Sequence, residues 1–193
     1  MKAPLYCALV HHPVRDRSGE TMTTAVTPLD VHDIARSART YGLKGYFLVT
    51  PVEAQQRLLQ RILGHWSDGG AGQRRMPERT NALGLCHLAR SLQDVIDQIT
   101  QLEGQAPVQV AIAARATGRP MVSVSALRRA LAAESTPHLL LFGTGHGLAD
   151  SLLAQADCLL APIGAGSDYN HLSVRAAAAI FFDRISGSDR EDC

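Results

Sequence analysis

The chain has 193 residues, of which 46% are hydrophobic and 19% are charged, and its formal net charge is +1. These proportions are those of a globular protein with a sizeable core, and the length fits a single domain that covers residues 1–193. The net charge argues against binding nucleic acid through bulk charge, but not against binding through a local basic patch. No apolar run approaches the length of a membrane span, so we expect no membrane association.

Short apolar runs alternate with helical patterns along the whole chain. The runs at residues 5–10, 45–50, 82–88, 107–114, 138–143 and 158–163 predict six strands. The patterns at 28–41, 52–66, 91–104, 123–134, 148–156 and 172–185 predict helices between and after them. Residues 11–26 are expected to form a loop or hairpin, and the Gly- and Arg-rich residues 67–80 a loop. This alternation predicts an α/β fold with a mostly parallel six-stranded sheet and helices on both faces.

The four cysteines, Cys7, Cys86, Cys158 and Cys193, are far apart in the sequence, and no CxxC pair occurs. Three of them lie in apolar runs, which is typical of buried free thiols. We therefore expect no metal site and a reducing, cytoplasmic environment.

The first predicted helix begins with a Thr27 cap, a proline at its first position and Asp30 in its first turn. Its polar face carries His32, Arg36 and Arg39, with Asp33 at the border. These are the side chains we consider for catalysis. The alternative is a solvated basic face with an ion pair between Asp33 and Arg36.

The sequence LLLFGTGHGL at 139–148 places three glycines directly after a strand and before a helix. Glycines there let the backbone approach a ligand. The spacing does not fit a dinucleotide fingerprint, because position 148 is Leu, and the loop comes too late in the chain. It also comes too late for the glycine loop that opens a Rossmann-type methyltransferase. A tight turn without a ligand is an equally good interpretation of this loop alone.

A second flexible loop at 161–166 follows the last strand, and the sequence Tyr-Asn-His-Leu-Ser at 169–173 precedes the last helix. Ser173 or Asn170 is expected to cap that helix. Its apolar face comprises Val174, Ala177, Ala178, Phe181, Phe182 and Ile185. The four alanines at 176–179 keep the first turns thin, which indicates that another segment packs closely there.

Three stretches together resemble the SPOUT methyltransferases, which have a trefoil knot: TAVTPLDVHDIARSARTYGLKGYFLVTP, LLLFGTGHGL and LLAPIGAGSDYNHLSVRAAAAIFFDR. The resemblance covers nearly the whole chain and is strongest to a small bacterial group similar to the methyltransferase domain of the tRNA (guanine-N1) enzymes. It implies a C-terminal trefoil knot and S-adenosyl-L-methionine as cofactor. The implied cofactor-binding residues are Phe142, Gly143, Thr144, Gly145, Gly147, Leu160, Pro162, Ile163, Gly164, Tyr169, Asn170, His171, Leu172 and Ser173.

The same resemblance implies a methyl transfer to RNA, to tRNA or rRNA, at a base nitrogen or a ribose 2′-hydroxyl. It also implies a homodimer. We assign Arg36 to the arginine that related enzymes carry on an early helix, with Asp33 and His32 as further candidates for catalysis. Arginines at positions 57, 61, 74, 75, 79 and 90 form a local basic excess that suits RNA phosphates, or a solvated loop. The alternative function is a catalytically silent homodimer that binds nucleotide or RNA.

Overall fold

The computed structural model describes residues 2–67, 71–113, 121–164 and 170–187. In these ranges seven strands form a parallel sheet in the order β5-β4-β1-β8-β6-β9-β7. The strands are β1 (Leu5–Val10), β4 (Gly45–Val49), β5 (Cys86–Ala89), β6 (Val108–Ile112), β7 (Met121–Val122), β8 (His138–Gly143) and β9 (Cys158–Leu160). A two-stranded ribbon of β2 (Val14–Arg15) and β3 (Thr21–Met22) follows β1.

The central strands are continuous apolar runs because both faces of the sheet are covered. All residues of β1 and β4 are buried. Side chains alternate between two core clusters: Cys7 and Leu9 of β1 belong to one, and Ala8 and Val10 belong to the other. The fold class predicted from the sequence is confirmed.

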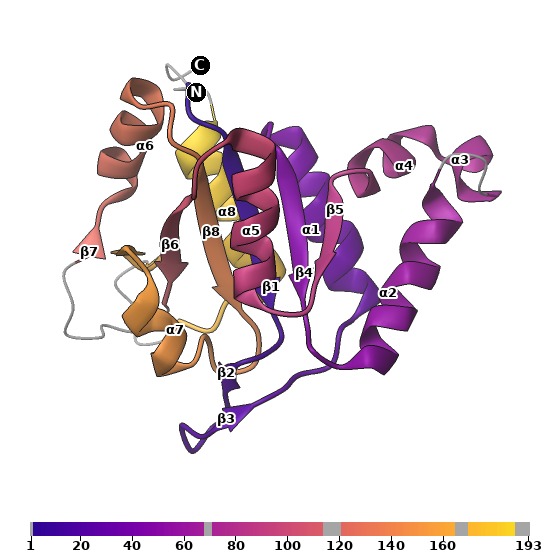
Figure 1. The fold of residues 1–193 in the computed structure, drawn as a ribbon, viewed down its shortest axis with the longest axis horizontal. Helices are drawn as coiled ribbons and strands as arrows, with labels where there is room; N and C mark the ends of the chain where they lie inside the picture. Colours follow the sequence, from indigo (N-terminus) through magenta and orange to yellow (C-terminus); the bar gives the residue numbers. More distant parts are fainter. Residues whose placement is uncertain (1, 68–70, 114–120, 165–169, 188–193) are drawn as a thin grey trace.

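The helices form a layer on each face of the sheet (Figure 1). Their bounds are α1 (Pro28–Thr40), α2 (Glu53–Trp66), α3 (Ala71–Arg75), α4 (Pro77–Leu83), α5 (Leu92–Glu103), α6 (Val124–Ala133), α7 (Asp150–Gln155) and α8 (Val174–Ser186). Helices α5 and α7 cover one face, and α1 and α8 pack together over the other with α2, α4 and α6 beside them. Within the described ranges, no helix has the length and apolar character that crossing a membrane requires.

Side-chain caps fix where α1 and α8 begin. Thr27 accepts a hydrogen bond from the Asp30 amide at the start of α1, and Ser173 accepts one from the Ala176 amide at the start of α8. The predicted start at Thr27 is confirmed, and of the two caps expected for the last helix, Ser173 and Asn170, the structure shows Ser173. A cap depends only on residues within one turn.

The structure differs from the sequence prediction in two places. A short seventh strand, β7, pairs with β9 at the sheet edge. The segment expected to be a loop from residue 67 contains α3 and α4, and α4 takes the first residues of the expected strand 82–88. Pro77 at the first position of α4 favours a helix start, and the buried side chains of Ala82 and Leu83 pack its last turn against the core. Packing against α1 thus outweighs the loop-like composition.

All seven sheet strands point the same way, so their carboxyl ends meet at one edge, the lower edge in Figure 1. From β1 the chain moves outward through β4 and β5, and then crosses to the other half of the sheet. Strands β1 and β8, which lie side by side, end together at Val10 and Gly143. Ligands of open parallel sheets bind at such a point, where the strand order reverses.

Candidate functional site

The glycine-rich residues Gly143–Gly147, here called the β8 turn, are held by the segment that follows β1. The amide of Thr144 donates to the Val10 carbonyl (3.2 Å), and the amide of His146 donates to the Arg15 carbonyl (3.1 Å). Gly145 and Gly147 have positive φ angles of 60° and 105°, which favour glycine. The β8 turn therefore has one fixed shape at the carboxyl edge of the sheet.

Two further predicted cofactor segments reach the same edge: residues 161–164, which follow β9, and residues 170–173, which precede α8. Gly164 is exposed, Asn170 is half-buried, and His171 and Leu172 are exposed. Phe142 and Leu160 are buried core residues, and Phe142 packs against Phe181 and Phe182. Tyr169 lies outside the described residues. The structure thus brings the three predicted loops to one edge.

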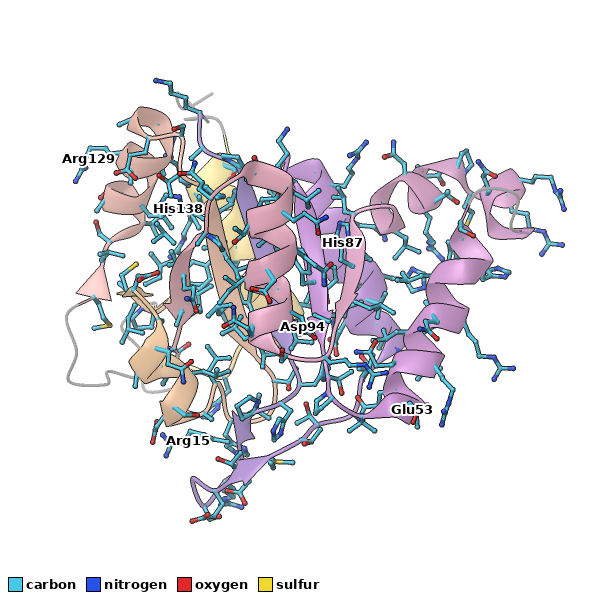
Figure 2. The ribbon with its side chains drawn as sticks, in the orientation of Figure 1. Arg15, Glu53, His87, Asp94, Arg129 and His138 are labelled. Carbon is cyan, nitrogen blue, oxygen red and sulfur yellow. The ribbon has the colours of Figure 1, made fainter. Side chains whose placement is uncertain are left out.

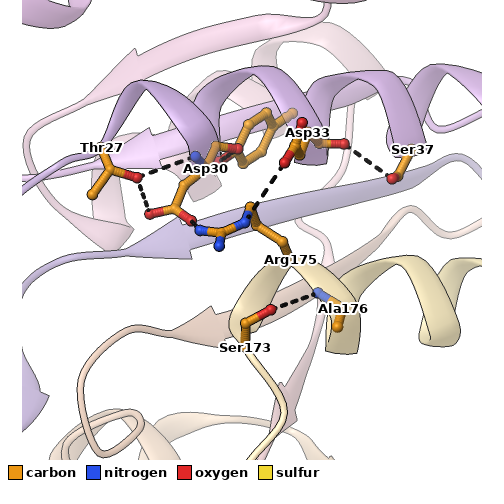
Figure 3. A network of polar contacts seen from close by, with 8 residues as sticks. Thr27, Asp30, Asp33, Ser37, Ser173, Arg175 and Ala176 are labelled. Atoms are coloured by element: carbon orange, nitrogen blue, oxygen red, sulfur yellow. Dashed lines mark hydrogen bonds and ion pairs between the residues drawn. The ribbon is translucent and has the colours of Figure 1, made fainter.

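An arginine that the sequence analysis did not consider joins α8 to α1 (Figure 3). Arg175, in the first turn of α8, places Nη1 2.6 Å from Asp30 Oδ1 and Nε 3.6 Å from Asp33 Oδ2. The Asp30 side chain is only 8% exposed and also accepts a hydrogen bond from the Thr27 hydroxyl (2.7 Å). This network fixes the start of α8, and hence residues 170–173, against the start of α1.

The three predicted catalytic residues lie on α1 in different surroundings. His32 packs edge-on against Trp66 of α2 with ring centroids 5.7 Å apart. Asp33 faces Arg175 instead of forming the pair with Arg36 considered above. Arg36 is exposed. Burial, followed by the nearby charge of Arg79, lowers the pKa of His32. His32 therefore belongs to the contact with the α2–α4 helices, whereas Asp33 belongs to the carboxyl edge.

A buried histidine at this edge was also missed from the sequence. His11 follows β1 directly, is fully buried, and places Nδ1 3.1 Å from the hydroxyl of Thr24. Thr24 in turn contacts the hydroxyl of Thr144 in the β8 turn. The doublet His11-His12 in a polar segment was the available signal, but the burial of one of the two depends on contacts made far along the chain.

A basic surface covers the outer side of α2 and α3. Arg57 and Arg61 project from α2, Arg74 and Arg75 are exposed on α3, and Arg79 of α4 stacks over Trp66 at 5.3 Å. Glu53 pairs with Arg57 at the start of α2, whereas Arg129 lies on α6 at the opposite end of the sheet (Figure 2). Residues 68–70, inside the predicted basic segment, lie outside the described residues.

Comparison with known proteins gives the family. A family model described as SAM-dependent RNA methyltransferase matches residues 4–187. A tRNA (guanine-N(1)-)-methyltransferase of Oleidesulfovibrio alaskensis is 45% identical over 95% of this chain, which spans 42% of that relative. An uncharacterized protein of Aquifex aeolicus is 38% identical, with 97% of this chain and 91% of that protein covered.

The fold comparison agrees with the sequence comparison. A probable methylase family protein from Haemophilus influenzae is similar with a TM-score of 0.64 and 15% identity, with 96% of this chain and 66% of that chain covered. At this identity the likeness shows the fold alone, but the family model covers almost the whole chain. The chain therefore belongs to the family of SAM-dependent RNA methyltransferases.

Proposed function

We propose that this chain transfers a methyl group from S-adenosyl-L-methionine to RNA. The observation that carries the proposal is the family match over residues 4–187, on a fold whose β8 turn lies at the switch point of the sheet. The chain spans less than half of its 45% identical relative, so the guanine-N1 activity in that relative's name is one candidate reaction. Transfer to a ribose 2′-hydroxyl is the other.

The residues at the carboxyl edge fit a cofactor that is recognised largely by the backbone. A Cβ on Gly164 would meet no atom of the described protein within 4 Å, so the backbone there is open to a ligand. The buried Nε2 of His11 has no hydrogen-bond partner among the described residues. We assign cofactor contacts to the β8 turn and to residues 160–164 and 169–173, where bound S-adenosylmethionine would supply an electrophilic methyl group.

The β8 turn contributes mainly its shape. Its amides at Thr144, His146 and Gly147 already donate within the protein. The ligand contacts are therefore expected from the remaining backbone groups of the turn and from the two later segments. In this arrangement the β8 turn forms one side of the cofactor site, and the two later segments supply most of the hydrogen bonds to the cofactor.

Arg36 is our candidate for the residue that acts on RNA. It is exposed, lies six residues after Asp30 on α1, and carries a positive charge suited to a phosphate. Asp33 lies between them, and His32 is turned toward Trp66. The arginines of α2 and α3 extend this charge outward, which supports RNA phosphate binding over the same end of the molecule.

We further propose that the chain is one domain with a C-terminal trefoil knot, acts as a homodimer and works in the cytoplasm. Segments 114–120 and 165–169, which bear on the chain crossing of a knot, lie outside the described residues. A homodimer is supported by the family resemblance and by exposed apolar side chains where α1 and α8 begin: Leu29 is 61% exposed and Leu172 46%.

The deciding experiment is methyl transfer from labelled S-adenosylmethionine to tRNA and rRNA from a strain that lacks the gene. Mass spectrometry of the nucleosides then identifies the modified base or ribose. We expect a methylated nucleoside to appear in one RNA class. If the chain binds S-adenosylhomocysteine and RNA but transfers no label to either class, it is instead a silent binding protein.

A further inference from the structure

A chain of polar contacts runs beneath the β8 turn. His11 Nδ1 lies 3.1 Å from the Thr24 hydroxyl, which contacts the Thr144 hydroxyl, and the Thr144 hydroxyl donates to the Val10 carbonyl (3.1 Å). The other ring nitrogen of His11, Nε2, is buried and has no partner in the described part of the chain. Buried polar atoms in folded proteins almost always have a partner, so this atom requires an explanation.

The contacts determine which ring nitrogen carries the proton, because each hydroxyl has a single hydrogen to donate. If Thr144 donates to the Val10 carbonyl, Thr24 donates either to Thr144 or to the His11 carbonyl (3.5 Å), and in both cases His11 Nδ1–H donates to Thr24. When Thr24 donates to Thr144, all three contacts are hydrogen bonds. The reverse order, in which Thr24 donates to Nδ1, loses the bond to Val10 and leaves an N–H buried without an acceptor. The first order is favoured, and it leaves Nε2 with a free lone pair.

The position of His11 places that lone pair among the proposed cofactor segments. In β1, Leu9 packs in the core on the side of α1 and α8, and Val10 packs on the opposite side. By strand alternation, His11 returns to the side of α1 and α8. The Asp30 carboxylate is close enough to His11 to favour the charged form of its ring. Asp30 also binds Arg175 at the start of α8. His11 therefore lies between the β8 turn and the network that fixes residues 170–173.

We propose that His11 Nε2 accepts a hydrogen bond from an O–H or N–H group of the ligand bound at this edge, so that His11 is a positioning residue for methyl transfer. This inference rests on the proposed function for the presence of a nucleoside-type ligand. The shared chemistry is a hydroxyl or amino donor, which belongs either to the cofactor's adenosine or to the RNA nucleotide. Because Nε2 is closed to water, the ligand reaches it only when the edge opens locally.

The acceptor role requires a neutral ring. Burial lowers the pKa of His11 to about 4, and the nearby Asp30 carboxylate opposes that shift only in part. The ring therefore stays neutral near pH 7, with its single proton on Nδ1. The contacts through Thr24 and Thr144 also link the tautomer to the β8 turn, so the hydrogen bonds that hold the turn favour the lone pair on Nε2.

The test is nitrogen NMR of the full chain with ¹⁵N-labelled histidine. The resonances of His11 are assigned as those that are absent from the spectrum of His11→Gln. The free protein should show a protonated Nδ1 and a bare Nε2. If S-adenosylhomocysteine alone moves the Nε2 resonance toward the hydrogen-bonded range, the donor belongs to the cofactor. If the shift appears only when tRNA is added as well, the donor belongs to the RNA. A proton on Nε2, or an Nε2 resonance that neither probe changes, overturns the proposal; the second result would indicate a resident water.

Variants separate this role from a structural one. His11→Gln should weaken either S-adenosylhomocysteine binding or methyl transfer by about tenfold, the scale of one buried hydrogen bond. His12→Gln is the matched control, because the neighbouring His12 also contacts a threonine, Thr23 (2.9 Å), and should behave like the parent chain. Thr24→Val keeps His11 but breaks the relay, and should change the tautomer. Equal behaviour of the His11 and His12 variants in both assays contradicts the proposal.

The two proposals fail in different ways. If His11 Nε2 responds to S-adenosylhomocysteine but no RNA is methylated, the proposed function is wrong, and His11 is a ligand-binding residue without a part in methyl transfer. If methyl transfer is observed while Nε2 stays silent with both probes, the function stands and His11 is only a buried structural residue.

Discussion

The residue that we assign to catalysis, Arg36, is exposed on α1 and is not part of the carboxyl-edge network. Arg36→Ala should therefore leave S-adenosylhomocysteine affinity unchanged, because no cofactor segment depends on it. Methyl transfer should fall by roughly a hundredfold, the scale of one positioned catalytic group. Arg129→Ala, which removes an exposed arginine on α6 at the opposite end of the sheet, is the control. Calorimetry and label transfer measure the two effects, and full activity in Arg36→Ala would remove the residue from the site.

His11 also makes stability depend on pH. Its pKa is about 4 in the folded chain and 6.5 as the ordinary value. Between pH 4 and pH 6.5 His11 is protonated in the unfolded chain but not in the folded chain. Its contribution to the free energy of unfolding is therefore fully present above pH 6.5 and is lost as the pH falls toward 4. At 1.36 kcal/mol per pKa unit, the loss is at most about 3 kcal/mol. His32 and His87, whose pKa values burial also lowers, add to it with the same sign.

Urea denaturation at pH 7 and pH 5 tests this contribution. His11→Gln should show a smaller loss of unfolding free energy between the two pH values than the parent chain. The exposed residue His146 provides the control, as His146→Gln removes a histidine from the surface of the same edge. If His11→Gln and the parent chain lose the same free energy, His11 does not titrate as its burial implies.

At the scale of elements, the Arg175 ion pair couples α8 to α1. Arg175→Met keeps most of the aliphatic stem but leaves the Asp30 carboxylate, which is 8% exposed, with the Thr27 hydroxyl as its only side-chain partner among the described residues. An uncompensated buried charge is costly, and because Arg175 is itself 34% exposed we expect about 2 kcal/mol of lost stability. Arg184→Met, at an exposed position of the same helix, should stay within about 0.5 kcal/mol. Chemical denaturation compares the two; equal values would make the pair a surface contact.

Two glycines distinguish the shape of a loop from its contact with a ligand. A Cβ on Gly143 would lie 2.6 Å from the Gly147 carbonyl carbon, so Gly143→Ala must deform the β8 turn. A Cβ on Gly164 would meet no atom of the described residues within 4 Å, so Gly164→Ala should fold normally. We expect Gly143→Ala to lower both stability and S-adenosylhomocysteine affinity, and Gly164→Ala to lower affinity alone. Unchanged affinity in Gly164→Ala would place the cofactor away from residues 160–164.

A substitution at Gly145 would be a poorer probe of the ligand. Its φ of 60° and the Arg15 carbonyl oxygen 3.1 Å from a Cβ make any side chain there strain the turn itself. Loss of binding in such a variant would report the backbone rather than the space that a cofactor occupies.

Elements with local signals could be predicted from the sequence, and long-range partners could not. Thr27, Pro28 and Asp30 define the start of α1 within four residues, and the structure confirms it. Helix α4 was missed, because its stability comes from packing Leu83 into the core rather than from its composition. The pair of Arg175 and Asp30 joins residues 145 positions apart, and no pattern along the chain marks such a contact.

At the scale of the molecule, the same limit explains why the candidate site was predicted as three loops and not as a set of contacts. The order of strands brings the ends of β1 and β8 together, although they are more than a hundred residues apart. Glycine content indicated which loops approach a ligand. The contact between the half-buried Thr24 and Thr144 follows only from the sheet order.

The assembly gives the last prediction. Leu29 and Leu172 are exposed apolar side chains where α1 and α8 begin, and Arg175 joins these two helices. We therefore expect both leucines to contact a second copy of the chain. Because a two-fold interface contains the same patch from both copies, like charges placed in that patch repel each other across the interface. We expect sedimentation velocity at micromolar concentration to show one species of twice the 20.7 kDa chain mass.

The double variant Leu29→Glu/Leu172→Glu should sediment as a monomer. Leu102→Glu is the control, because Leu102 is 63% exposed on α5, on the opposite face of the sheet, and this variant should stay dimeric. Dissociation of the Leu102 variant instead would move the interface to the α5 face. A parent chain that sediments as a monomer and still methylates RNA would show that one copy contains the complete site, and the proposed dimer would then have no part in the reaction.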